Sequence, residues 1–213
     1  MLPTESIRRV LDAGLTKGAD LAEVYLENKE SLSLTLDEGR LEKATQGNDI
    51  GGGVRVFYGN NAAYAYTDDL TEESLIEAAG VAAAAAENAN NAQVCADLTK
   101  RESPVVSRIE RPFEEMSTQE KAGILREMDE VTRQHSPHIV SVQCGYTETR
   151  RRVWVYNSEG VWAEDDRAFI EFQGQVAAQK GDVRQSSATG VGGQVGLELF
   201  DDRDPVAMIA RGS

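Results

Sequence analysis

The stretch that decides the fold class is Ser31-Leu32-Ser33-Leu34-Thr35-Leu36-Asp37-Glu38-Gly39-Arg40. Its leucines alternate with small hydroxyl residues, which is the period-two pattern of a strand that buries one face. Asp37-Glu38-Gly39 is a turn signal, and residues 40–45 predict a returning strand. So short a connection joins antiparallel neighbours, because parallel strands need a long crossover. The stretch therefore predicts an antiparallel sheet.

Further segments on both sides of this hairpin predict more strands and several helices. Strands are predicted at residues 24–26, 51–58, 62–67, 139–145, 151–156, 161–164, 169–179 and 194–199. Helices are predicted from residue 4 until Gly18, from 71 to about 88, from 117 until Pro137, and after 205. Thr71 is the expected N-cap of the second helix. Ser117-Thr118-Gln119-Glu120 has the capping-box pattern at the start of the third.

The order of these elements predicts an α+β fold made of two similar helix–antiparallel sheet–helix units. Residues 1–90 form the first expected unit and residues 117–213 the second, which ends at the start of a truncated helix. Residues 91–116 hold prolines and no sustained period, so they are expected to be an irregular connection. The repeated order leads to the hypothesis of an internal duplication.

The composition excludes several classes of function. A formal net charge of −14 opposes both nucleic-acid binding and docking on an anionic membrane, since each needs clustered basic residues. The amino terminus lacks the basic and apolar segments of a secretory signal. With only two cysteines, a disulfide framework is not expected. These features together predict a cytoplasmic protein.

The residues that usually carry hydrolytic or metal chemistry are sparse. The only histidines, His135 and His138, flank Ser136-Pro137, where the proline breaks the helical register that a zinc pair needs. Cys95 and Cys144 are interpreted as ordinary thiols, although a hydrolase that uses Cys144 remains a weaker alternative. The acidic runs 164–166 and 201–204 lack the spacing of a calcium loop and are interpreted as solvated turns. We therefore predict no catalytic, cofactor-binding or metal-binding residue in this chain.

Two glycine clusters, at residues 51–53 and 190–196, resemble phosphate-binding loops only superficially. Each is expected to lead into a strand, whereas a phosphate cradle uses the amino terminus of a helix. The second cluster follows a polar segment, and the two together are expected to form a flexible loop that approaches a substrate backbone. The residues of that expected loop are Arg184, Ser186, Ser187, Gly190, Gly192 and Gly193.

Several segments, in order, resemble the amino-terminal half of the TldD/PmbA metallopeptidases, also called the modulator of DNA gyrase family. They are residues 18–25, the glycine-valine-arginine strand 51–56, the strand-to-helix step 63–70, residues 117–126 and the turn 157–160. Residues 184–200 are similar to the serine- and glycine-rich segment of TldD-like members, so the chain looks more TldD-like than PmbA-like. Leu197, however, stands where an aromatic residue is common, which leaves the choice between the two open.

The resemblance implies a zinc-dependent peptidase that acts on peptides or small unfolded proteins. It places the metal motif H-E-x-x-x-H and a further cysteine ligand in a carboxy-terminal half, which nothing in this sequence matches. The chain is accordingly expected to be a substrate-admitting and assembly fragment that is inactive alone, and to pair in a homodimer or heterodimer of family members. The alternative is a noncatalytic PmbA-like partner or scaffold subunit. The gyrase label does not imply DNA binding.

Overall fold

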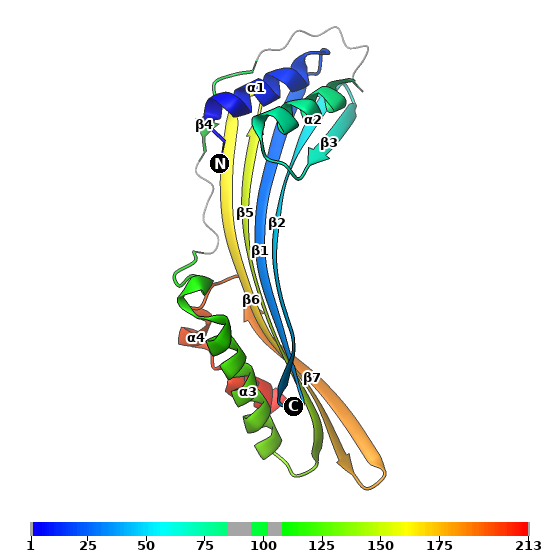
Figure 1. Ribbon diagram of the computed structural model, residues 1–213, viewed down its shortest axis with the longest axis vertical. Coiled ribbons are helices and arrows are strands. Elements are labelled where there is room, and N and C mark those ends of the chain that lie inside the picture. The colour runs from blue at the N-terminus through cyan, green and yellow to red at the C-terminus, as the bar shows by residue number, and fades with distance from the viewer. Residues whose placement is uncertain (1, 85–94, 102–107, 213) are drawn as a thin grey trace. The chain divides into compact units, whose positions relative to one another are not determined.

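The computed structural model describes residues 2–84, 95–101 and 108–212, which form five α-helices, one 3-10 helix and seven strands (Figure 1). The helices are α1 (Thr4–Leu15), α2 (Glu72–Ala84), η1 (Phe113–Glu115), α3 (Thr118–Gln134), α4 (Leu199–Asp202) and α5 (Pro205–Gly212). The strands are β1 (Leu21–Asp37), β2 (Arg40–Tyr58), β3 (Asn61–Thr67), β4 (Thr99–Lys100), β5 (Ile139–Asn157), β6 (Val161–Lys180) and β7 (Val183–Gly193). The predicted α+β class is confirmed.

All seven strands belong to one mainly antiparallel sheet in the order β3-β2-β1-β5-β6-β4, with β7 also paired to β6. The β2–β3 register runs from Gly52 opposite Thr67 to Tyr58 opposite Asn61. The β6–β7 register runs from Ile170 opposite Gly193 to Lys180 opposite Val183. The short strand β4 pairs with β6 in parallel.

Four strands are about twice as long as the sequence predicts, because pairs of predicted strands are continuous. Residues 24–26 and 32–36, for example, belong to the single strand β1. Between them, residues 27–31 are all partly exposed, so no buried face produces alternation there. A period-two pattern reports the burial of one face, and it disappears where neither face is buried although the backbone stays extended.

The chain divides into two compact units. Unit 1 comprises residues 1–29, 48–104 and 151–166, and unit 2 comprises residues 30–47, 105–150 and 167–213. Each unit thus draws on three separate segments of the chain. The division expected from the sequence, at residues 1–90, 91–116 and 117–213, stays a prediction, and the duplication is not confirmed.

In unit 1, α1 and α2 pack against each other and against one face of the sheet (Figure 1). Thr71 caps α2 as predicted, since its Oγ1 accepts from the amide of Ser74 at 3.3 Å. The predicted end of this helix, residues 85–88, lies outside the described residues. The buried core holds leucine, isoleucine and valine side chains and the small alanines of α2: Ile7, Val10, Leu11, Val24, Leu26, Val54, Val56, Leu75, Ala78, Ala79 and Ala82.

In unit 2, α3 and α5 pack together over a second core (Figure 1). The capping box at Ser117 is confirmed, with Glu120 as the reciprocal partner. Gly174 of β6 is required under α5, because a Cβ there would overlap the side chain of Ile209. The core side chains include Leu34, Leu36, Phe113, Leu125, Met128, Val142, Cys144, Phe172 and Ile209.

The turn predicted at Asp37-Glu38-Gly39 occurs, and two residues make it, because Asp37 still belongs to β1. Glu38 and Gly39 both have positive φ, 48° and 74°, which is the conformation of a type I′ turn. Glu38 is held there by Arg133, which donates to its Oε2 at 2.9 Å, and by the amide of Val142. A hydrogen bond from Ser141, followed by the bonds from Arg133 and Val142, lowers the pKa of Glu38.

The strand predicted at residues 194–199 is wrong. Residues 194–198 form bends and turns that lead into α4. Gly196 lies so close to the carbonyl of Arg111 that no side chain fits there. Glu198 accepts hydrogen bonds from the amides of Gly196 and Arg111, at 2.7 and 3.0 Å. These two carboxylate–amide bonds, one local and one to the distant Arg111, take the place of a sheet partner.

Candidate functional site

The residues predicted to form a substrate-approaching loop lie instead in strand β7. Every residue from Val183 to Gly193 pairs with β6. The loop expectation failed because residues 183–188 are all exposed and lack an apolar period. Whether Arg184, Ser186, Ser187, Gly190, Gly192 and Gly193 approach a substrate stays a prediction.

Strand β7 presents backbone groups on its outer edge. Arg203 Nη1 donates to the carbonyl oxygen of Gly192 at 3.0 Å, which indicates that this carbonyl points away from β6. Because backbone groups alternate in direction along a strand, those of Gly190, Ala188 and Ser186 point the same way. An edge of this kind is a template for another extended chain.

A groove of about 570 Å³ lies on unit 2, and its lining residues come from β1, β5, β6 and β7. Ser186 and Ser187 line it together with residues that the sequence analysis missed. The lining residues are Asp37, Ser141, Gln143, Gln175, Val176, Ala177, Ser186, Ser187 and Ala188. The sequence signal for the missed polar residues was the alternation of polar and buried positions in β5. Ser141 precedes the buried Val142, and Gln143 lies between the buried Val142 and Cys144.

The chemistry of this groove is that of neutral hydrogen bonding. Gln143 and Gln175 each offer an amide with donors and an acceptor, and Ser141 and Ser186 offer hydroxyl groups. Asp37 is the one charged residue in the lining. Such side chains can bond peptide carbonyl and amide groups, but they supply neither a nucleophile with an adjacent base nor a metal-ligand set.

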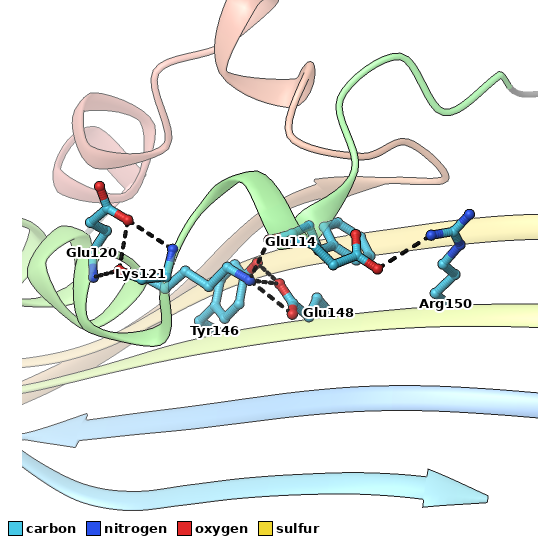
Figure 2. Close-up of polar contacts among 8 residues, drawn as sticks. Glu114, Glu120, Lys121, Tyr146, Glu148 and Arg150 are labelled. Atoms are coloured by element: carbon cyan, nitrogen blue, oxygen red, sulfur yellow. Dashed lines mark hydrogen bonds and ion pairs between the residues drawn. The ribbon is translucent and has the colours of Figure 1, made fainter.

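In the interior of unit 2, a buried ion pair between Lys121 and Glu148 connects α3 to β5 (Figure 2). Lys121 Nζ donates to Glu148 Oε1 at 2.9 Å and to the carbonyl of Phe113 at 2.9 Å. The Tyr146 hydroxyl donates to Glu148 Oε2. Lys121 is only 3% exposed and Glu148 9%. Burial raises the pKa of Tyr146, with Glu148 as a further cause, so Tyr146 keeps its proton.

This ion pair has every sign of a structural role. Its two donor groups, Lys121 Nζ and the Tyr146 hydroxyl, are both bonded to acceptors within the protein, and Lys121 is buried. A second, more exposed pair joins Arg150 to Glu114 at 3.3 Å near the same place (Figure 2). Together they set the position of α3 and η1 against the sheet.

The cysteines are not arranged as nucleophiles. Cys144 is fully buried in the core of unit 2, and burial raises the pKa of its thiol to about 12. Cys95 is free and buried as well, and burial raises the pKa of its thiol. A thiol must ionise to attack, so neither site favours nucleophilic chemistry at neutral pH.

We expect both thiols to resist modification in the folded chain. At pH 8, a pKa of about 12 leaves about one Cys144 thiol in 10,000 ionised. Ellman's reagent at pH 8 should therefore react with Cys144 only after urea is added. It should react with Cys95 far more slowly in the folded chain than after urea is added. Rapid, stoichiometric labelling of Cys144 without urea would contradict this expectation and favour the alternative of a hydrolase that uses Cys144 as its nucleophile.

The described residues do not fit a catalytic metal. Within them, no three histidine, cysteine, aspartate or glutamate side chains gather as a metal site would require. His135 ends α3, where its amide donates to the carbonyl of Thr132 at 3.1 Å, and His138 follows Pro137. No step of metal chemistry is therefore assigned to these residues.

The two acidic runs have local partners. Glu164 accepts from Lys100 at 2.5 Å and from Trp162 at 3.0 Å, and it lies in β6 rather than in the expected turn. Asp201 pairs with Arg111 at 2.9 Å. Asp204 accepts from the amide of Ala207 at 3.0 Å, in the first turn of α5. These contacts give Glu164, Asp201 and Asp204 partners within the protein.

Of the helices that the structure describes, none combines the length and the apolarity that crossing a membrane requires.

Two family models match the chain. The one described as PmbA/TldA metallopeptidase domain 1 matches residues 22–86. The one described as the PmbA/TldA metallopeptidase central domain matches residues 111–212. Together these matches cover most of the chain.

Curated relatives with the name metalloprotease TldD homolog are similar to the chain. The protein of Haemophilus influenzae is 22% identical over 200 residues, which cover 93% of this chain and 42% of the relative. That of Buchnera aphidicola subsp. Schizaphis graminum is 21% identical over 189 residues, covering 89% and 39%. The chain thus spans less than half the length of the curated relatives it matches.

Solved structures share the fold at low sequence identity. A candidate modulator of DNA gyrase from Thermotoga maritima has a TM-score of 0.75 and 16% identity, over 98% of this chain and 46% of that one. TldE from Thermococcus kodakarensis has a TM-score of 0.69 and 15% identity, over 97% and 46%.

Proposed function

This chain belongs to the PmbA/TldD metallopeptidase family, and we therefore propose that it is the amino-terminal, substrate-admitting and assembly part of a zinc-dependent peptidase. The zinc and the residues that bind it would lie in a carboxy-terminal half, as the resemblance to the family implies, and the described residues of this chain hold no group of ligands for a metal. The substrates are peptides or small unfolded proteins in the cytoplasm. The protein pairs with itself or with another family member.

The observation that carries this proposal is the outer edge of β7 beside the polar groove. Outward backbone groups at Ser186, Ala188 and Gly190 can pair with an extended peptide as an added strand. The serine and glutamine side chains of the groove can bond peptide groups without selecting for side chains. Such binding suits unfolded substrates of varied sequence.

We expect the full-length protein to cleave an unfolded peptide when zinc is present, and the 213-residue chain to cleave none. The assay compares the two proteins on one peptide, followed by mass spectrometry, with and without a chelator. Cleavage by the 213-residue chain alone would contradict the proposal. Cleavage by neither protein would favour the alternative, a noncatalytic partner or scaffold subunit. The coding sequence after Ser213 separates these two as well, by the presence or absence of H-E-x-x-x-H.

Ser186→Pro in the full-length protein is expected to lower kcat/KM for peptides about five- to tenfold. The proline removes one outward amide donor, worth about 1 kcal/mol, and edge strands tolerate proline where the amide faces outward. Ser186→Ala is the comparison variant, because it keeps that amide and removes only the side-chain hydroxyl, so it should lower kcat/KM less than Ser186→Pro does. Equal kcat/KM for Ser186→Pro and the unchanged protein would exclude β7 as the binding edge.

A further inference from the structure

A narrow trough on unit 1 is left unexplained by the proposed function. Its volume is about 340 Å³, and it is floored by glycine and walled by tyrosine. The lining residues are Tyr25, Glu27, Asp49, Ile50, Gly51, Gly52, Tyr64, Tyr66, Thr67 and Asp68. All of them belong to β1, β2, β3 or the segment just after β3.

Glycines of β2 leave the open face without side chains, and Gly51 lines the trough there. A Cβ at Gly52 would lie 2.7 Å from Leu26 and 2.9 Å from Leu70, so Gly52 faces the core. Alternation then places Gly51 and Gly53 on the opposite, open face. The ring of Tyr64 lies over Gly53, where a Cβ would overlap it. Because β2 has no side chains at these two positions, Tyr25 of β1 and Tyr64 and Tyr66 of β3 project beyond β2 on either side of it.

The tyrosine walls are unusually exposed. Tyr66 is 78% exposed, Tyr64 59% and Tyr25 39%. The rings of Tyr64 and Tyr66 are stacked, with centroids 6.4 Å apart and 20° between their planes. Exposed aromatic faces grouped around a depression are typical of a binding surface, since a folded chain otherwise buries them.

Carboxylates supply the charge at this surface. Glu27 accepts from the Tyr25 hydroxyl and lies 3.6 Å from Arg151 Nε, and Asp49 lies 4.0 Å from Lys29 Nζ. Asp68 makes no ion pair with any residue that the structure describes. A ligand side chain with an apolar stem and a cationic end group would fit this surface. The stem would pack between the tyrosine rings, and the cation would contact a ring face and pair with the Asp68 carboxylate.

We propose that this trough binds an arginine or lysine side chain of a basic peptide. The net charge of −14 favours such an occupant over a second copy of this chain, which would bring the same charge. The inference goes beyond the proposed function, because it concerns unit 1 and is measured as binding without cleavage.

The test titrates the 213-residue chain with the peptide Ac-Gly-Gly-Arg-Gly-Gly-NH2 and with its norleucine counterpart, followed by NMR. The Kd for the arginine peptide should be about tenfold lower, which corresponds to a cation–π contact together with one carboxylate. Tyr66→Ala and Asp68→Asn should each raise that Kd at least about threefold. Binding should also weaken as sodium chloride increases.

Matched controls are available outside the trough. Tyr58→Ala and Asp182→Asn make the same chemical changes at residues that do not line it, and they should leave the Kd unchanged. Tyr66 is too exposed for its truncation to unfold the chain, which circular dichroism would verify. Ser186→Pro should leave the ratio of the Kd values for the arginine and norleucine peptides unchanged, because the β7 edge does not select for side chains, so failure of the β7 proposal and failure of this one are distinguishable. Equal affinity for the two peptides, no binding, or an unchanged Kd in Tyr66→Ala would each overturn the inference.

Discussion

Lys121→Met is expected to destabilise the folded chain by about 3–5 kcal/mol. Lys121 Nζ lies 2.7 Å from Glu148 Oε2 in the core of unit 2, and both side chains are almost fully buried. Removal of the ammonium group leaves the Glu148 carboxylate buried, with the Tyr146 hydroxyl as its remaining partner among the residues that the structure describes. The free energy of unfolding in urea, from circular dichroism, measures the loss.

Two further variants test whether the loss comes from the unpaired charge of Glu148. Lys121→Met/Glu148→Leu should recover most of the lost stability, because replacing both partners of a buried pair removes the uncompensated charge. Arg111→Met removes the cation from the more exposed pair with Asp201 and should cost less than about 1 kcal/mol. A loss below about 1 kcal/mol for Lys121→Met would show that Glu148 reaches solvent or another cation.

Gly160→Ala is expected to destabilise the chain by about 2–4 kcal/mol, through the turn between β5 and β6. Gly160 has a φ of 91°, and a Cβ there would lie 2.6 Å from the carbonyl oxygen of Asp97. The carbonyl of Gly160 also accepts from the amide of Thr99 at 2.8 Å, so any shift of the turn disturbs β4. Urea unfolding again gives the measurement.

Gly59→Ala is the control for the backbone conformation alone. Gly59 has a φ of 55°, and nothing lies within 4 Å of a Cβ at that position. The expected loss is about 1–2 kcal/mol, the cost of a left-handed conformation without a steric overlap. If Gly160→Ala costs no more than Gly59→Ala, the close approach of Asp97 is not a constraint.

Sequence reasoning succeeded where the chemistry is local. The N-cap at Thr71 and the capping box at Ser117 occur as predicted, and the turn predicted at Asp37-Glu38-Gly39 is made by Glu38 and Gly39. Each depends on side-chain and backbone groups within a few residues of one another, so a single short window holds all the information. The α+β class followed from the same turns, because short turns impose antiparallel pairing.

The candidate sites were predicted only in part. Ser186 and Ser187 were singled out, but as members of a loop, and Ser141, Gln143 and Gln175 of the same groove were not found. The trough on unit 1 was missed entirely, although the glycines at 51–53 had been noticed. A glycine becomes a cavity floor only when neighbouring strands place larger side chains beside it, as β3 does with Tyr64 and Tyr66.

Local sequence therefore determined the helix caps, the tight turns and the class of fold, since these need only neighbours along the chain. The tertiary structure alone decided that predicted strands merge, that residues 183–193 pair with β6, and that Lys121 meets Glu148. The physical reason is the same in each case. Pairing partners and buried charges meet across large separations in sequence, and their free energy arises only when the sheet has brought them together.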